Sequence, residues 1–524
     1  MKLNRIIKQI ISILAGIVCI FLLIINLFYI NNIDSSEFSV IERCGVSQIA
    51  IYIGIIFGIF IICFLVYKIR INRIIKSILT CFIFGTYMII SFIWVSKAIT
   101  IPFADSAQIM EISKSISGFS NLTEYSHNYL AYYPQQITLS VLFSGVFNAF
   151  GKVDYRIIEY LNVVCNLISM IGLSFILKHF SKKYTVNRAV FFVFSLTFLP
   201  VILLATFVYG DFIGMPFLIW ALYMALKFVE SNKKRYVMIT CILTAIGCLF
   251  RMNYIIFAIA IVLYWLINIC LQEHFNIKRW LYGFIIVSIF VVIAFIPSTI
   301  LKKIYMNKYS IDSSKSFSTI PYVYMGMSEG DRGYGWYNNA MGDKVYHMMS
   351  DSKEQSQKIS QECRDELNAR IKFLVKNPMY TIKFYTYKNI SMWAEPTMEA
   401  SFYNGFIEEG KKIEEHPLAK SVADGKIKNY TKLYQKALII LILFSTILVI
   451  IFNRKDGNCD IYLFTLVFLG GFSFHMLWEA KSRYIIPYYI SLIPIATIGL
   501  SMFMEKIDGT ILKNKKRKGN VIIL

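Results

Sequence analysis

The sequence predicts an all-α polytopic membrane protein with about twelve transmembrane helices and a large α-rich extracytoplasmic region. Two observations carry this prediction. The composition is 56% hydrophobic and 16% aromatic, with a mean hydropathy of +0.56, which is far from that of a soluble domain. Apolar runs of the length that crosses a bilayer also recur from one end of the chain to the other.

Twelve apolar stretches are predicted to span the membrane. They lie at residues 5–30, 48–67, 77–100, 157–180, 189–208, 213–229, 237–250, 255–272, 280–300, 434–453, 459–477 and 485–503. The first stretch is too long for the core of a signal peptide and lacks a clear small-residue cleavage site. We therefore expect it to be a retained span.

Short basic clusters predict the orientation of these spans. They precede the first span, follow every second span up to the tenth, and fill the tail. All of them fall on one side of the membrane if both termini are cytoplasmic, as the positive-inside rule requires. This distribution accounts for the formal net charge of +22 and argues against nucleic acid as a partner. The basic residues are Lys2, Arg5, Lys8, Lys68, Arg70, Arg73, Lys76, Lys182, Lys183, Arg188, Lys233, Lys234, Arg235, Lys278, Arg279, Arg454, Lys455, Lys513, Lys515, Lys516, Arg517 and Lys518.

The apolar stretch at residues 136–150 is an exception to this scheme. Counting it as a further span would reverse the orientation of everything that follows. It is short and contains Ser140, Ser144 and Asn148, so we predict a helix that lies at the outer interface. Residues 105–156 then form one outer loop.

The second outer region, residues 301–433, is too long for a structureless loop and should carry its own fold. Helical periodicity predicts a helix at residues 352–376. Asn377 and Pro378 should end that helix and begin the next, because proline is favoured in a first helical turn.

Residues 325–339, near the start of this region, are rich in glycine, aromatic rings and side-chain amides. Such a loop suits a sugar, since flat rings stack on it and amides bind its hydroxyls. Trp336 and Asn338 are the candidate contacts. The alternative is a turn-rich surface loop with no ligand.

The pattern predicts five parts. They are an N-terminal transmembrane hairpin (1–76), a transmembrane core (77–300) with an outer loop at 101–156, an extracytoplasmic region (301–433), C-terminal transmembrane helices (434–503) and a basic cytoplasmic tail (504–524). The ten cysteines are scattered without metal-type spacing and imply no disulfide framework, although Cys44 and Cys363 are both expected on the outer side.

Charged residues recur at the predicted outer ends of spans. A charge near hydrocarbon is costly, so a set of charges on one face favours a functional site. The alternatives are ordinary solvated loop residues for the acids, and an i,i+4 ion pair at a helix end for Glu479 and Arg483. The set is Asp105, Arg156, Asp211, Arg251, Glu479 and Arg483.

These residue types point to one reaction. A carboxylate can take the proton from an acceptor hydroxyl, and a guanidinium can bind a phosphate oxyanion with two parallel donors. Together they describe glycosyl transfer from a lipid phosphate at the membrane surface. The sequence contains no phosphate-cradling glycine motif of the kind that binds nucleotides.

Short motifs follow one another in a fixed order along the predicted outer face. They are Ala104-Asp105-Ser106, Tyr133-Pro134, Arg156, Tyr209-Gly210-Asp211, Arg251-Met252-Asn253, and Glu479 to Tyr484 followed by Pro487. This order resembles the GT-C-type integral membrane glycosyltransferases, akin to the protein O-mannosyltransferases and the aminoarabinose transferases that modify lipid A (glycosyltransferase family 39-like). The likeness extends over most of residues 77–503.

The resemblance implies roles for individual residues and an inverting transfer at the extracytoplasmic face. Asp105 would be the general base, at the start of a catalytic outer loop. The implied catalytic residues are Asp105 and Asp211, the donor phosphate-binding residues are Arg483, Arg251 and Arg156, and the substrate-binding residues are Glu479, Tyr484, Tyr133, Tyr209, Trp336 and Asn338.

The resemblance also implies the partners. The donor would be a polyprenyl-phosphate-linked sugar in the cell membrane, and the acceptor a cell-envelope glycan, lipid or protein. Ser106 stands where the family commonly has a second acid, which leaves the use of a divalent metal open but unsupported. The monosaccharide-phosphate users of the family resemble this chain better, so no cofactor is expected. The first two spans and residues 301–433 match no family motif and are expected to carry acceptor specificity.

Two other classes of function compete with this interpretation. A multispan transporter or lipid-linked sugar flippase would place charges near the bilayer midplane and often shows paired halves, whereas here the charges gather at one face and no half-repeat is visible. A non-catalytic scaffold of envelope assembly would leave Asp105 and Asp211 replaceable.

Overall fold

The computed structural model describes residues 2–69, 72–270, 276–312, 319–350, 353–452 and 460–519. Of the residues named above, Arg70, Ser352, Arg454 and Lys455 lie outside these ranges. The described residues form 22 α-helices and two small antiparallel hairpins, which confirms the all-α polytopic class.

The elements follow in chain order. The α-helices are α1 (Lys2–Phe28), α2 (Val46–Lys68), α3 (Arg73–Lys97), α4 (Asp105–Ile116), α5 (Glu124–Tyr132), α6 (Gln136–Phe150), α7 (Tyr155–Phe180), α8 (Arg188–Leu196), α9 (Leu199–Leu203), α10 (Gly210–Ser231), α11 (Lys234–Phe250), α12 (Ile255–Ile269), α13 (Ile277–Lys308), α14 (Ile320–Gly326), α15 (Asn339–Ser350), α16 (Lys353–Lys376), α17 (Pro378–Trp393), α18 (Ala400–Tyr403), α19 (Pro417–Asp424), α20 (Lys426–Phe452), α21 (Tyr462–Leu477) and α22 (Ile486–Gly519). The 3₁₀ helices are η1 (Leu204–Thr206), η2 (Met252–Tyr254), η4 (Ile413–Glu415) and η5 (Ser482–Ile485), and the strands are β1 (Tyr29–Ile33), β2 (Ser39–Arg43), β3 (Glu329–Gly330) and β4 (Gly333–Tyr334).

Each of the twelve predicted spans coincides with helical structure. In the described ranges, nine helices are long and apolar enough to cross a membrane, and α8 with α9 and η1 forms a further candidate that is bent by 45°. The remaining two predicted spans correspond to α11 and α21, which have 17 and 16 residues and are shorter than a typical span. The chain is a multi-pass membrane protein.

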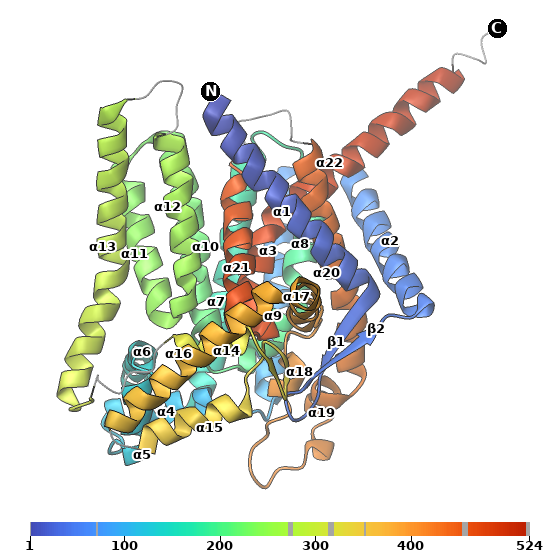
Figure 1. The fold of residues 1–524 in the computed structure, drawn as a ribbon. Coiled ribbons are helices and arrows are strands. Elements are labelled where there is room, and N and C mark those ends of the chain that lie inside the picture. Colours follow the sequence, from blue (N-terminus) through green and yellow to red (C-terminus); the bar gives the residue numbers. More distant parts are fainter. Residues whose placement is uncertain are drawn as a thin grey trace.

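The arrangement of the bundle separates its two ends. Figure 1 shows the described start of α1 and the described end of α22 at the same end, and α4, α5, α6, α15 and α16 at the opposite end. We call this opposite end the loop end. The start of α1 and the end of α22 lie at the same end if the chain crosses the membrane an even number of times. The helix α6, which is predicted to lie at the interface, packs against α4 there.

Burial distinguishes central from peripheral helices. In their most apolar windows, α22 is 94% buried and α20 is 72% buried, whereas α2 is only 17% and α3 and α13 only 22% buried. The peripheral helices instead expose large side chains such as Phe57, Phe82 and Phe284. Apolar side chains that face outward along a whole helix are expected where lipid surrounds the bundle.

The predicted fold of the second outer region is confirmed at its centre. The helix expected at residues 352–376 is α16, which ends before Asn377, and α17 begins with Pro378 in its first turn. The loop expected at residues 325–339 is present at residues 327–338, with the short β3–β4 hairpin inside it. Met325 and Gly326 end α14, and Asn339 begins α15. Cys44 and Cys363 are free, and the thiol of Cys363 lies 3.7 Å from the sulfur of Met341.

Candidate active site

Three helix ends meet at the centre of the candidate site. Asp211 lies in the first turn of α10, Arg251 caps the end of α11, and Arg483 lies in η5 before α22. Gly210 permits the close approach of the first two, because a Cβ atom at this position would lie 2.0 Å from the carbonyl oxygen of Phe250. A glycine beside Asp211 therefore brings its carboxylate to the arginine at the neighbouring helix end.

The carboxylate of Asp211 lies between two guanidinium groups. Its Oδ1 atom is 3.2 Å from Nε of Arg251, and its Oδ2 atom is 3.6 Å from Nη1 of Arg483. Asp211 and Arg483 are each 8% exposed. In such a buried setting, the shared carboxylate offsets part of the cost of burying the two guanidinium charges.

Two tyrosine rings fix the orientation of the guanidinium planes. The guanidinium carbon of Arg251 lies 4.8 Å from the ring centre of Tyr209 and 5.1 Å from that of Tyr484. The same carbon of Arg483 lies 5.7 Å and 4.8 Å from these two rings. The Tyr209 hydroxyl accepts a hydrogen bond from Gln136 of α6 at 2.6 Å. Cation–π contacts and this bond give the arginine pair a preset geometry.

Arg483 has a second acidic neighbour, Glu399, which was not among the predicted site residues. Its Nε atom donates to the hydroxyl of Tyr403 at 3.0 Å and lies 3.7 Å from Oε2 of Glu399, which is fully buried. The Oε1 atom of Glu399 accepts from the backbone N–H of Ser482 at 2.7 Å, so it caps η5. The carboxylate thus holds both the side chain and the backbone of the arginine segment.

The turn at residues 395–399 places Glu399. Glu395 accepts from the backbone N–H groups of Thr397 and Glu399 at 2.9 and 2.7 Å. Met398 and Glu399 have positive φ angles of 50° and 65°, which side-chain-bearing residues rarely adopt. The signal in the sequence was the pair of glutamates at 395 and 399 in otherwise apolar surroundings, since an acid in such a setting is buried only with partners.

Asp105 is the first residue of α4 and its side chain is exposed. The hydroxyl of Tyr129, from α5, donates to Oδ1 of Asp105 at 3.0 Å. Ala104, just before it, has φ of +51° and ψ of −124°, a strained conformation for alanine. The negative charge of Asp105 raises the pKa of both Tyr209 and Glu479, so Asp105 lies near the cluster around Asp211.

Glu479 connects these two parts of the site. It is 5% exposed and follows α21, in the connection that leads to Arg483. Burial raises the pKa of Glu479 to about 7, whereas the neighbouring Lys481 opposes this shift. Tyr133, the residue that caps α5, lies within electrostatic range of both Glu479 and Asp105.

Three of the predicted site residues have polar groups that bond to residues other than Asp105, Asp211 and Glu479. Arg156 pairs with Glu159 at 3.3 Å and Glu408 at 3.2 Å, so its guanidinium is engaged elsewhere. Trp336 is fully buried and donates its indole N–H to Ser391 at 2.9 Å. Asn338 accepts from the backbone N–H of Met341 at 3.3 Å, at the start of α15.

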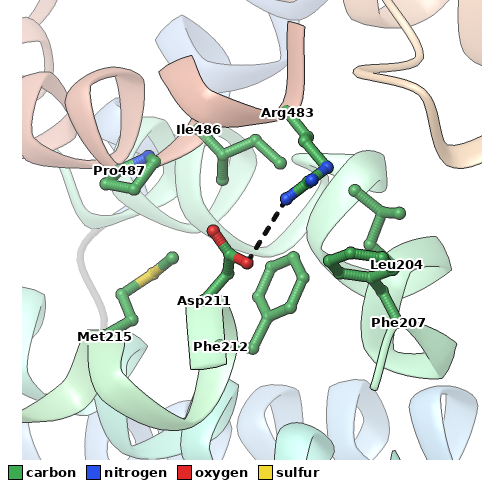
Figure 2. A pocket seen from close by; sticks show the side chains of 8 residues that line it. All are labelled: Leu204, Phe207, Asp211, Phe212, Met215, Arg483, Ile486 and Pro487. Carbon is green, nitrogen blue, oxygen red and sulfur yellow. Dashed lines mark ion pairs between the residues drawn. The ribbon is translucent and has the colours of Figure 1, made fainter. Parts of the chain in front are cut away.

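A small pocket opens beside the Asp211–Arg483 pair (Figure 2). Its cavity volume is about 10 Å³, which is room for about one water molecule. Its lining side chains are Leu204, Phe207, Asp211, Phe212, Met215, Arg483, Ile486 and Pro487. Oδ2 of Asp211 and Nη1 of Arg483 have no hydrogen-bond partner within the described residues. The pocket thus combines an apolar wall with one charged pair that has free bonding capacity.

The described residues contain no group of three or more His, Cys, Asp or Glu side chains arranged to hold a metal ion. The cluster offers the exposed carboxylate of Asp105, the arginine pair Arg251 and Arg483 with Asp211 between them, and the buried acid Glu479. These groups can accept a proton, bind an oxyanion and hydrogen-bond a hydroxyl.

A comparison with known protein families finds a match over part of the chain. The model of a family described as dolichyl-phosphate-mannose-protein mannosyltransferase matches residues 139–298, from α6 to α13. The matched segment contains Tyr209, Asp211 and Arg251, whereas Asp105 and Arg483 lie outside it. No match is found among curated proteins. The family match confirms the resemblance of this chain to the GT-C-type integral membrane glycosyltransferases.

Proposed function

We propose that this protein transfers a monosaccharide from a polyprenyl-phosphate donor to a cell-envelope acceptor at the extracytoplasmic face of the cell membrane. The observation that carries the proposal is the buried Arg251–Asp211–Arg483 arrangement at helix ends, with Asp105 at its border. Lipid-linked donors suit this chain, because its sequence contains no nucleotide-binding motif.

The two arginines are the proposed site for the donor phosphate. Their guanidinium planes are held by Tyr209 and Tyr484, so little ordering is needed when an oxyanion arrives. Asp211 keeps the two positive charges together in the absence of substrate. Partial burial strengthens their attraction to the negative charge that grows on the leaving phosphate.

Asp105 is the proposed general base. Its exposed carboxylate, aligned by Tyr129, can reach an acceptor that approaches from outside. The acceptor oxygen gives its proton to Asp105 and bonds to the anomeric carbon of the sugar. The bond from that carbon to the phosphate oxygen breaks, and polyprenyl phosphate leaves. Attack opposite to the leaving group inverts the anomeric configuration.

Glu479, Tyr133 and Tyr484 are proposed to bind the sugar between these two groups. A protonated Glu479 can donate a hydrogen bond to a sugar oxygen and does not repel the phosphate. Tyrosine rings offer flat apolar surfaces together with a hydroxyl group. Arg156, Trp336 and Asn338 are not part of this proposal, because their contacts lie elsewhere.

The test measures transfer directly. Purified protein in lipid vesicles is incubated with radiolabelled polyprenyl-phosphate hexose and a cell-envelope extract, and the labelled product is separated. We expect the wild-type protein to form product, and Asp105→Asn to lose about 100-fold or more of its turnover. Glu111→Gln is the matched control, since Glu111 is an exposed acid on the same helix. Near-normal turnover of Asp105→Asn would remove Asp105 from the role of base.

A further inference from the structure

The hairpin formed by β1 and β2 reaches from the first two spans to the candidate active site. Its turn residue Glu37 is 7% exposed and has a φ angle of +65°. The carboxylate of Glu37 pairs with Nζ of Lys481 through Oε1 and with Nη1 of Arg332 through Oε2. Lys481 lies two residues from Glu479 and two from Arg483, so the hairpin contacts the segment that carries both groups.

Backbone hydrogen bonds make this connection continuous. The backbone N–H of Asn31 in β1 donates to the carbonyl of Ala394, which caps the end of α17, at 3.1 Å. The backbone N–H of Ser39 in β2 donates to the carbonyl of Arg332 at 2.9 Å. Within the same loop, the carbonyl of Gly335 accepts from the backbone N–H of Ala480 at 2.7 Å. The hairpin, the 332–335 loop and the 478–485 segment are therefore joined without a gap.

Separate contacts support the 478–485 segment at Trp478, Lys481 and Ser482. Lys388 donates to the carbonyl of Trp478 at 2.8 Å, and Glu399 accepts from the N–H of Ser482 at 2.7 Å. Glu37 supports the middle through Lys481. Because both partners are largely buried, removal of one takes a close counter-ion from the other and should loosen this segment.

Lys481 lies among several acids. It is within electrostatic range of Glu37, Glu399 and Glu479. The positive charge of Lys481 lowers the pKa of Glu479, and the negative charge of Glu37 raises it. Other groups in range of Glu479 are Asp105, Arg483, Lys388, Tyr133, Tyr322, Tyr337 and Tyr484.

We infer that Glu37 is a positioning residue of the transfer site, which holds Lys481 away from Glu479 and keeps the 478–485 segment in its active arrangement. This inference rests on the proposed function of that site. It gives the N-terminal transmembrane pair, which matches no family motif, a part in the reaction. The hairpin acts through Lys481 and does not touch the reacting atoms.

The first test follows backbone hydrogen exchange of the full-length protein in lipid nanodiscs by mass spectrometry. Glu37→Gln should speed exchange at residues 478–485 by about tenfold and leave α20 unchanged. Glu42→Gln is the matched control, because Glu42 is an exposed acid on the same hairpin whose carboxylate accepts from Asn32. Lys481→Gln removes the other partner and should loosen the same segment, which covers the case that Glu37→Gln does not fold. Equal exchange at 478–485 in the wild type and the folded variants would overturn the inference.

The second test uses transfer activity against pH. Glu37→Gln should lower kcat/KM about 10- to 100-fold and move the alkaline limb of the profile to lower pH, because the pKa of Glu479 falls. Lys481→Gln should move that limb to higher pH. If both variants move the alkaline limb in the same direction, or neither moves it, then Glu37 and Lys481 do not control the charge of Glu479 as inferred. If the wild-type protein transfers no sugar, the proposed function fails, and the exchange measurement alone decides the inference.

Discussion

The Nε atom of Arg251 lies 3.2 Å from Oδ1 of Asp211, at the point where the end of α11 meets the start of α10. Arg483 approaches the other oxygen of the same carboxylate at 3.6 Å. One buried acid thus organises two arginines that come from distant parts of the chain. Its removal should affect both stability and activity.

Asp211→Asn keeps the shape of the side chain but leaves two buried guanidinium groups without this counter-ion. We expect it to destabilise the protein by about 3–5 kcal/mol, since the loss of one partner of a buried ion pair has this effect. Transfer should fall about 100-fold or more. Thermal unfolding in detergent and the radiolabel assay measure the two quantities. Asp343→Asn, which changes an exposed acid of α15, is the control and should change neither.

Arg483 should require a guanidinium and not only a positive charge. Its Nε atom donates to Tyr403, and its plane lies against Phe207 and Tyr484, contacts that a lysine cannot reproduce. We expect Arg483→Ala to be nearly inactive and Arg483→Lys to lose about tenfold or more in kcat/KM for the donor. Arg364→Ala, at an exposed position of α16, serves as the control. Wild-type kinetics of Arg483→Lys would contradict the donor-site assignment.

Glu479 should give the pH profile an alkaline limb. Its pKa is raised by burial from 4.5 to about 7, so the folded protein keeps the proton through this window and loses it above about pH 7. The negative charge that then forms repels the donor phosphate, and the KM for the donor should rise. Glu479→Gln stays neutral, so its profile should lack this limb. A limb near pH 7 that persists in Glu479→Gln would assign it to another group.

The sequence predicted the charged residues at helix ends because hydropathy locates those ends along the membrane normal. It does not locate them around the bundle. Asp211, Arg251 and Arg483 meet, but Arg156, at the start of another span, turns to Glu159 and Glu408 instead. Hydropathy therefore predicts only how deep a residue lies in the membrane. Which helices are its neighbours depends on tertiary packing.

The partners that complete the site could not be predicted for the same reason. Glu37 and Lys481 are separated by 444 positions, and Glu399 and Ser482 by 83, so no local pattern relates them. Trp336 shows that the composition of a loop does not tell which of its rings are accessible to a ligand. It lies in a loop with the chemistry of a sugar site, yet its ring is fully buried and its N–H is bonded to Ser391.

The orientation of the bundle gives the last prediction. If residues 105–156 lie outside, a reporter fused after Gly151 should be active on the extracytoplasmic side, and one fused after Lys183 should be cytoplasmic. The helix α7 lies between these positions and, with 26 residues, is long enough to cross the bilayer. Paired alkaline phosphatase and fluorescent protein fusions report the two sides. Because α6 has only 15 residues, it should remain at the loop end of the bundle beside α4. The same reading from both fusions would show that α7 does not separate them, and it would place Asp105 and the basic cluster after α7 on one side, which the proposed mechanism does not allow.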